Sequence, residues 1–302
     1  MNTPTSTAWS RPGIIDFELT PGSLTTFRIH TPLVTARFAT QGAHLIDFIP
    51  TGGVPLLFVS ANSHFAAGKA IRGGIPVIFP WFGPRTGHPE SPMHGLVRTR
   101  PWEISALEVR PDHSVRVEFR FASSPETMEL WPYAFELKLE FVLGTDLHVR
   151  WEVKNSGPES FRFEQALHPY FPINDVFQAS VHGLKGGEYI DKTDGLSVKQ
   201  ESAEWVSFGA ETDRLYLDTS ATCILEDKSA GRRLVITKEG SQSSVVWNPW
   251  IAKAAALSDL GDEEWKEFVC VEQVNADRNS LELNPGGTHV FTVRYSPQSV
   301  AI

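Results

Sequence analysis

The 302-residue chain has 41% hydrophobic and 21% charged residues, a composition typical of a globular protein and too apolar for a disordered one. Lysine and arginine number 27 against 36 aspartate and glutamate, so the formal net charge is −9. This charge argues against nucleic acid and against anionic membranes as partners. It allows a small anionic ligand, because charges beyond about 8–10 Å are screened and one or two local arginines outweigh them.

Cysteine usage and the N-terminal residues indicate a soluble, cytoplasmic chain. Cys223 and Cys270 do not lie in a CxxC pair and are too few for a disulfide framework, so we expect two inert core thiols. Residues 1–13 lack the basic start and apolar run of a secretory signal. No stretch approaches the roughly 18 apolar residues of a membrane helix.

Alternation of apolar and polar residues is the dominant pattern. It is clearest in Val115–Phe121, Phe135–Phe141 and Leu147–Val153. Such alternation predicts antiparallel strands with one solvated face, and Leu143–Asp146 is the expected hairpin turn between two of them. Further strand-like runs are 14–19, 25–30, 33–39, 45–49, 161–167, 176–181, 215–218, 223–226, 234–237, 244–247, 268–274, 280–283 and 289–295.

Helical signals are scarce. Ser63–Lys69 would form one or two helical turns, and Asp262–Phe268 begins with acidic residues that suit a short helix. Nearly continuous strands without a linker or an internal repeat predict an all-β fold. We expect one large antiparallel β-sandwich, with residues 1–302 as a single domain. Two all-β domains are the structural alternative.

Two short segments place arginine and histidine beside glycine. Ala70–Arg85 reads AIRGGIPVIFPWFGPR, in which Arg72 precedes a glycine pair that permits positive φ or close approach to a ligand. Arg72 would present a planar fork to a phosphate or carboxylate, unless it is a solvent-facing residue of an ordinary turn. Met93–Arg98 reads MHGLVR, with His94 and Arg98 around a glycine, and a surface loop with one structural histidine is the alternative.

Two further segments carry groups suited to proton transfer. In Phe161–Pro172 (FRFEQALHPYFP), alternation puts His168 on the face away from the phenylalanines, as a candidate proton donor or a hydrogen-bonded structural histidine. In Phe268–Gln273 (FVCVEQ), both faces are largely apolar. Desolvation of Glu272 would raise its pKa toward the range of a general base. An arginine-paired structural glutamate is the alternative.

The remaining features concern sugar, nucleotide and metal ligands. Trp247 and Trp250 flank Asn248-Pro249 and would form either an aromatic shelf for a sugar ring or part of the core. The sequence contains no GxGxxG, GxxxxGK[ST], HExxH or GxSxG motif, and its ten histidines show no metal-ligand spacing. We therefore expect neither a metal nor a cofactor.

In combination and in order, several motifs resemble those of the hexose-6-phosphate mutarotases, or glucose-6-phosphate 1-epimerases, of the aldose 1-epimerase family. They are RGGIPVIFPWFGPR, HGLVR, a histidine before Pro-Tyr-Phe, KGGEYID, WNPW and CVEQ, and together they span about residues 30–295. The resemblance implies a galactose mutarotase-like supersandwich that binds sugar on a concave sheet face. It also implies an isomerase that acts on a small hexose phosphate, glucose 6-phosphate above all. We expect the protein to be monomeric.

The resemblance further implies roles for individual residues. The matching positions are His168 and Glu272 for the catalytic pair, Arg72 and Arg98 for the phosphate contacts, Asp191 for a substrate-binding aspartate, and His94 for a sugar-contacting histidine. Met93 stands where some members of the family have glutamine. This replacement removes one possible hydrogen bond to the ligand and bears on which sugar is preferred.

Interconversion of anomers needs a base that takes the C1 hydroxyl proton and an acid that protonates the ring oxygen. The ring opens, the aldehyde rotates, and the roles reverse on closure. The implied assignment is Glu272 as base and His168 as acid, which requires a raised pKa of His168 so that it is protonated near neutral pH. Two other functions stay open: an aldose 1-epimerase for unphosphorylated sugars, and a non-catalytic carbohydrate-binding β-sandwich.

Overall fold

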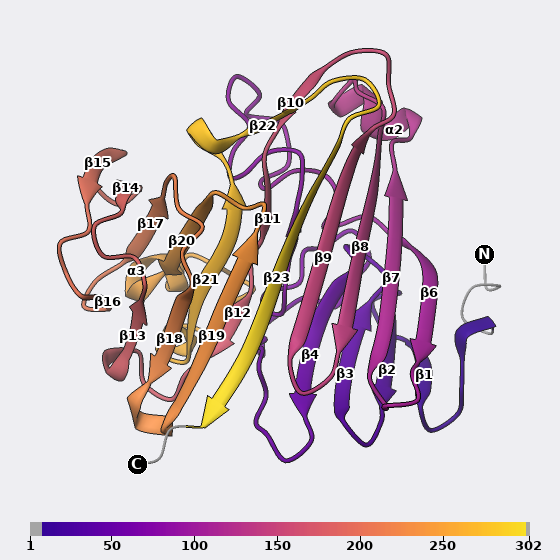
Figure 1. Ribbon diagram of the computed structural model, residues 1–302, viewed down its shortest axis with the longest axis horizontal. Coiled ribbons are helices and arrows are strands. Elements are labelled where there is room, and N and C mark those ends of the chain that lie inside the picture. The colour runs from indigo at the N-terminus through magenta and orange to yellow at the C-terminus, as the bar shows by residue number, and fades with distance from the viewer. Residues whose placement is uncertain (1–7, 300–302) are drawn as a thin grey trace.

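The computed structural model describes residues 8–299, so the first seven residues of the stretch inspected for a signal segment lie outside it. Strands dominate the described chain and form antiparallel sheets, as the alternating sequence predicts (Figure 1). The sheets have nine, eight, four and two strands. The predicted all-β sandwich is therefore confirmed.

The nine-stranded sheet runs across the whole molecule, with the long strand β23 near its middle (Figure 1). It contains the three strongly alternating segments, and the predicted hairpin turn joins Leu143 to its cross-strand partner Leu147. In sheet order the strands are β16 (Trp205–Ser207), β13 (Ala179–His182), β18 (Cys223–Asp227), β19 (Arg232–Glu239), β23 (Thr288–Ser299), β9 (Leu147–Asn155), β8 (Phe135–Leu143), β7 (Val115–Ala122) and β6 (Glu103–Val109).

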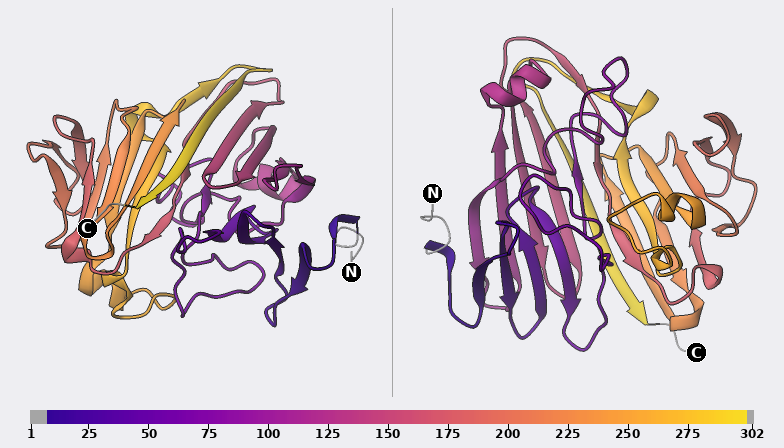
Figure 2. Two further views of the ribbon diagram at one scale, coloured as in Figure 1. Left: turned by 60° about the horizontal axis from the view of Figure 1, so that its bottom comes forward. Right: turned by 180° about the vertical axis from the view of Figure 1, so that it is seen from behind.

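Two smaller sheets pack behind the nine-stranded sheet, one behind each half (Figure 2). The four-stranded sheet consists of β1 (Ile15–Leu19), β2 (Thr25–His30), β3 (Val34–Ala39) and β4 (His44–Pro50). The eight-stranded sheet consists of β15 (Ser197–Gln200), β14 (Glu188–Asp191), β17 (Thr212–Tyr216), β20 (Ser243–Asn248), β21 (Phe268–Asn275), β11 (Gln165–Leu167) and β5 (Val77–Ile78), with β12 (Tyr170–Pro172) also paired to β21. Strands β10 (Phe161–Phe163) and β22 (Leu281–Leu283) form a separate pair.

Aromatic side chains hold the layers together. Phe38 of β3 packs against Phe119 of β7 and Phe141 of β8, with ring centroids 5.7 and 5.1 Å apart. All three side chains are fully buried because they occupy the apolar positions of alternating strands. One hydrophobic cluster extends from Ile15 to Tyr295, so the strongest feature of the sequence also builds the core.

The helices are short, and one predicted helix is wrong. Ser63–Lys69 has no helix, because its main chain bonds outward, for example from Gly68 N–H to the Gln41 side chain at 2.7 Å. Asp262–Phe268 contains only the 3₁₀ turn η3. The described helices and 3₁₀ turns are α2 (Pro125–Leu130), α3 (Trp250–Ala255), η1 (Val176–Gln178), η2 (Lys228–Ala230), η3 (Glu264–Lys266) and η4 (Asp277–Asn279). Within residues 8–299, none of the helices has the length and apolarity needed to cross a bilayer.

Polar contacts mark one face of the eight-stranded sheet as the inter-sheet face. Lys238 of β19 donates to Ser244 Oγ of β20 at 2.9 Å, and the Tyr295 hydroxyl of β23 donates to the Gln273 side chain of β21. The opposite face, here called the site face, points away from the nine-stranded sheet. The long irregular segment 51–102 lies on this side of the molecule (Figure 2).

The buried ammonium of Lys238 gives a test of this packing. Burial lowers its pKa to about 8, and no carboxylate among the described residues forms an ion pair with it. A lysine in the unfolded chain has a pKa of about 10.4. Between these values the unfolded chain binds more protons than the folded chain, so the free energy of unfolding rises with pH.

We expect the wild-type chain to gain up to about 3 kcal/mol of stability relative to Lys238→Met between about pH 7 and about pH 10. Urea denaturation of both proteins across this range measures the difference. If the free energy of unfolding changes with pH equally in both proteins, the Lys238 ammonium is not held in the inter-sheet core.

Candidate active site

The register of the eight-stranded sheet collects one row of side chains on the site face. Asp213 of β17 lies opposite Trp247 of β20, Trp247 lies opposite Cys270 of β21, and Cys270 lies opposite Tyr170 of β12. Directly opposite residues share a face, and so do residues two apart along a strand. Glu272, two residues beyond Cys270, therefore belongs to the same face.

His168 reaches this face because it follows the last residue of β11. Leu167 lies opposite Gln273, which is on the inter-sheet face, so the next side chain points to the site face. Nε2 of His168 lies 3.2 Å from Oε1 of Glu272. The imidazole stacks on the Tyr170 ring, with centroids 5.0 Å apart and planes 16° apart. Residues remote in sequence thus form one buried acid–base pair.

Burial sets the protonation of this pair. The side chain of Glu272 is 1% exposed and that of His168 is 10% exposed. Desolvation raises the pKa of Glu272 well above its usual value and lowers the pKa of His168 to about 3, an effect that Arg72 and Arg98 reinforce. Burial thus favours the neutral form of each group, a protonated carboxyl and a neutral imidazole. The expectation of a raised pKa for His168 is wrong, because desolvation lowers this pKa.

Two polar atoms of the pair are unsatisfied. Among the described residues, Nδ1 of His168 and Oε2 of Glu272 have no hydrogen-bond partner although both atoms are buried. Buried polar groups in proteins are nearly always paired, so such atoms indicate a place for a polar ligand or a bound water. Within the described residues, Glu272 forms its ion-pair contact with His168 and none with an arginine, so the arginine-paired alternative is not what the structure shows.

Arg72 lies in the site but its fork is occupied. Its Nε and Nη2 donate to Oδ1 of Asp259 at 3.1 and 3.0 Å, and its Nη1 donates to the Tyr170 hydroxyl at 3.1 Å. The following Gly73 has φ +118°, and a Cβ there would lie 2.4 Å from the Phe58 carbonyl oxygen. The glycine is therefore required by backbone packing, which in turn fixes Arg72 beside the pair.

Arg98 is less engaged. Its Nη2 donates to the Met93 carbonyl at 2.8 Å, and among residues 8–299 no carboxylate lies within ion-pair distance of it. Burial and the nearby Arg72 lower its pKa. The Met93 side chain is half exposed. An arginine without a counter-charge, next to another arginine, is a ready partner for an anion.

His94 stands at the edge of the pair. It has φ +64°, and its Nδ1 accepts from the Gly83 N–H at 3.2 Å. Its ring lies edge-on to His168, with centroids 5.9 Å apart. Burial lowers its pKa well below the usual value, so it is a neutral imidazole. The structure thus brings His94, Arg72 and Arg98 together with His168 and Glu272.

Asp191 is the one predicted site residue that the structure does not bring to the site. The cross-strand register places it on the other face of the sheet, which corrects its expected role. Asp191 lies opposite Arg214 of β17, whereas the site face carries the preceding residue, Asp213. Asp191 instead accepts from Thr193 Oγ1 at 2.7 Å and from Lys199 Nζ at 2.8 Å, within its own hairpin. Strand alternation, which the KGGEYID motif does not reveal, places it on the wrong face.

Sequence reasoning missed three charged residues of the site: Lys192, Asp213 and Asp259. The side chain of Lys192, next to Asp191, has its Nζ 3.6 Å from Oδ1 of Asp213 and 4.4 Å from the centre of the Phe82 ring. The alternation of residues 212–216 could have indicated that Asp213 lies in a strand. A charged residue in an alternating strand, however, is usually taken to face solvent. Asp259, in the loop after α3, offered no signal at all.

The two tryptophans of WNPW separate. Trp247 is buried on the site face, with its ring edge-on to His168 at 5.7 Å between centroids. Trp250 begins α3 and packs against Trp265 at 4.4 Å. Only Trp247 therefore serves as an aromatic wall of the candidate site.

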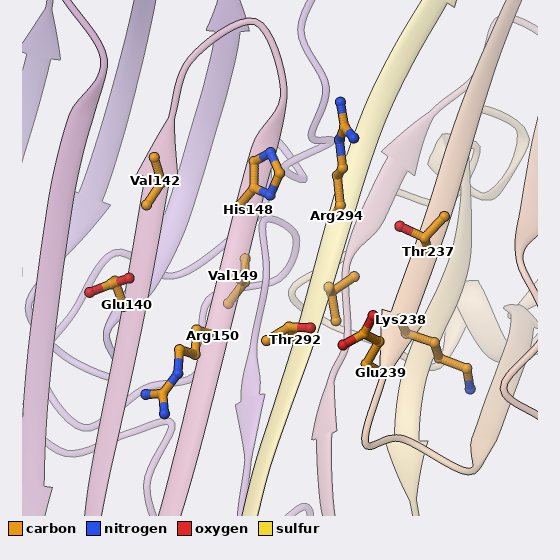
Figure 3. Close-up of a pocket in the computed structure, with 11 residues that line it drawn as sticks. Glu140, Val142, His148, Val149, Arg150, Thr237, Lys238, Glu239, Thr292 and Arg294 are labelled. Atoms are coloured by element: carbon orange, nitrogen blue, oxygen red, sulfur yellow. The ribbon is translucent and has the colours of Figure 1, made fainter.

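A groove of about 450 Å³ lies elsewhere, on the solvent side of the nine-stranded sheet (Figure 3). Both of its arginines are already paired: Arg294 donates to Asp146 at 2.8 Å and Arg150 donates to Glu152 at 2.8 Å. It contains neither member of the acid–base pair. Among residues 8–299, no group of histidine, cysteine, aspartate and glutamate side chains has the arrangement of a metal site.

A β-sandwich with a buried carboxyl–imidazole pair on one sheet face is suited to acid–base chemistry. Residues 25–296 match the family model described as aldose 1-epimerase. The chain belongs to the aldose 1-epimerase family and is an epimerase.

Individual relatives agree with this assignment. Proteins named "Putative glucose-6-phosphate 1-epimerase" from Salmonella typhimurium and Escherichia coli are each 35% identical to the chain, over 81% and 86% of both sequences. The crystal structure of a "putative mutarotase" from Salmonella typhimurium superposes with a TM-score of 0.89 at 29% identity, covering 96% of this chain and 95% of the other. A galactose mutarotase-like protein from Clostridium acetobutylicum, at 15% identity and a TM-score of 0.70, shares the fold.

The assignment of faces predicts different effects for two neighbouring carboxylates. Asp213→Asn should lower kcat/KM for sugar anomerisation at least about tenfold, because it weakens a charged hydrogen-bond acceptor on the site face. Asp191→Asn should leave kcat/KM within about twofold of wild type. Polarimetry of a freshly dissolved single anomer measures both rates. Equal losses in the two variants would contradict the face assignment.

Proposed function

We propose that the protein interconverts the α and β anomers of a hexose 6-phosphate, with glucose 6-phosphate as the preferred substrate. The observation that carries the proposal is the 3.2 Å contact between His168 and Glu272, in which one carboxyl oxygen of Glu272 has no hydrogen-bond partner among the described residues. Next to this pair, Arg72 and Arg98 have one paired carboxylate between them within residues 8–299, that of Asp259. The names of the relatives support the same substrate. The monomeric state, the cytoplasmic location and the single-domain organisation stay predictions.

The local charge supports a phosphorylated substrate. Around the neutral pair, the cations Arg72, Arg98 and Lys192 face the carboxylates of Asp213 and Asp259. The surroundings of the pair are therefore positive although the whole chain carries −9. In a buried site these charges act with little screening, so a phosphate dianion is attracted and an unphosphorylated sugar gains nothing from the excess.

The chemistry follows from the one proton that the pair holds. With the proton on Glu272, the pair is arranged for ring closure. The carboxyl protonates O1 of the open-chain aldehyde while neutral His168 takes the proton from the O5 hydroxyl. Ring opening uses the opposite arrangement, with Glu272 as carboxylate and His168 as imidazolium. A proton moves between the two along the 3.2 Å contact.

Substrate binding favours the ring-opening arrangement. The positive charges of Arg72 and Arg98 lower the pKa of His168. A phosphate dianion bound to these arginines offsets their field, so the imidazolium becomes less costly once substrate is present. We further propose that Asp213 accepts a hydrogen bond from a sugar hydroxyl and that Trp247 lies against the ring. Asp191 takes no part.

Removal of either member of the pair should abolish most of the catalysis. Glu272→Gln and His168→Asn keep the approximate shape of each side chain but cannot exchange the proton, so kcat should fall about 10²–10⁴-fold in each. A coupled assay of α-to-β conversion of glucose 6-phosphate gives the rates. A near-normal kcat in either variant rejects that residue's role, and a wild-type protein that binds sugar without accelerating anomerisation is a carbohydrate-binding module instead.

Charge reversal at Arg98 should separate phosphorylated from free substrates. Arg98→Glu is expected to lower kcat/KM for glucose 6-phosphate at least about 100-fold, because a charge-assisted bond becomes a repulsion, and to change kcat/KM for free glucose far less. Arg100→Glu is the matched control, since the Arg100 side chain donates to the Leu96 carbonyl in the same loop. Equal losses with both sugars would favour an epimerase of unphosphorylated aldoses.

A further inference from the structure

Lys192 lies in the wall of the site without touching the acid–base pair. Its backbone N–H donates to the Asp213 carbonyl at 2.9 Å, which extends the pairing of β14 with β17 and turns its side chain to the site face. Its ammonium lies 4.4 Å from the centre of the Phe82 ring and 3.6 Å from Oδ1 of Asp213. The side chain is 27% exposed, so the cation is partly withdrawn from water.

Aromatic contacts connect this cation to the pair. The Phe82 ring lies edge-on to His94 at 5.2 Å, and His94 lies edge-on to His168 at 5.9 Å. The backbone N–H of Phe82 donates to the Glu164 carboxylate at 2.8 Å, which fixes the loop that carries the ring. The Lys192 ammonium is therefore held at a defined place. It lies at one end of a row of packed rings, Phe82 and then His94, that ends at the His168 imidazole.

We propose that Lys192 is a positioning residue for the acid–base pair. Its ammonium holds the Asp213 carboxylate on the site face and supplies the positive field that lets Glu272 carry negative charge during ring opening. The inference deepens the proposed function and rests on it. It assigns to Lys192 a role distinct from the arginines: Lys192 adds to the positive charge around the site but makes no direct bond to the phosphate, and it acts on the proton of the pair.

Titratable and charged groups face the pair from several elements. Lys192 after β14 and Asp213 of β17 act on Glu272, and Lys253 of α3 is paired with Asp213. Tyr170 of β12 and Cys270 of β21 lie beside Glu272, while Arg72 and Arg98 of the 51–102 segment act on His168. Lys192 lowers the pKa of Glu272, while Asp213 raises it. Lys192 also lowers the pKa of His168. Loss of its charge therefore raises both values, and the pair keeps its proton to higher pH.

The test compares pH profiles of kcat/KM for glucose 6-phosphate in wild type, Lys192→Met and Lys192→Arg. We expect the alkaline limb to move upward by about 0.5–1 pH unit in Lys192→Met and to stay in place in Lys192→Arg, which keeps the charge. Lys199→Met is the matched control, since Lys199 forms an ion pair with Asp191 on the other face. A ¹⁵N NMR titration of His168 should show a raised imidazole pKa in Lys192→Met, without reference to turnover.

Each outcome decides a separate point. An unshifted limb and an unchanged His168 titration in Lys192→Met overturn the inference. A raised KM for glucose 6-phosphate with an unchanged kcat and limb also overturns it, because Lys192 would then bind the phosphate. Failure of wild type to convert any hexose or hexose phosphate rejects the proposed function, and the NMR titration still tests the effect of Lys192 on the pair.

Discussion

The structure depends on one buried contact, between the Glu272 carboxyl and the His168 imidazole. Two ionisable groups placed together in an apolar sheet face cannot both be charged without cost, and cannot both lose their proton without leaving an uncompensated anion. They share one proton instead, and this sharing makes the pair suitable for a reaction that moves a proton in both directions. Catalysis then needs only a small change in the surrounding field to shift the proton between them.

The scaffold supplies both the apolar surroundings and the field. The eight-stranded sheet has an inter-sheet face that packs on the nine-stranded sheet and a site face that carries the pair. Arginines from the irregular segment 51–102 approach the site face from outside the sheet, and Asp259 neutralises one of them. Because a strand sends alternate side chains to opposite faces, the same strands serve stability and chemistry at once.

Net charge and local charge differ in this protein for a physical reason. Many acidic side chains, among them those of Glu103, Glu136 and Glu282, are exposed, so water and salt screen them. The cations near His168 are partly buried, where screening is weak. Lys192 and Arg98 thus influence the pair more than the −9 of the whole chain does. Their separate roles, one toward the proton and one toward the phosphate, follow from their different neighbours.

The sequence by itself determined most of the strands, because the alternation of apolar and polar residues is a local property. It also indicated Glu272 and His168, since a carboxylate in FVCVEQ and a histidine at a strand end are visible without coordinates. It misplaced Asp191, and it missed Lys192 and Asp213, because the face on which a residue lies depends on cross-strand register. Only the tertiary structure decided which charges surround the pair and therefore where its proton lies, since desolvation and field arise from residues brought together by folding.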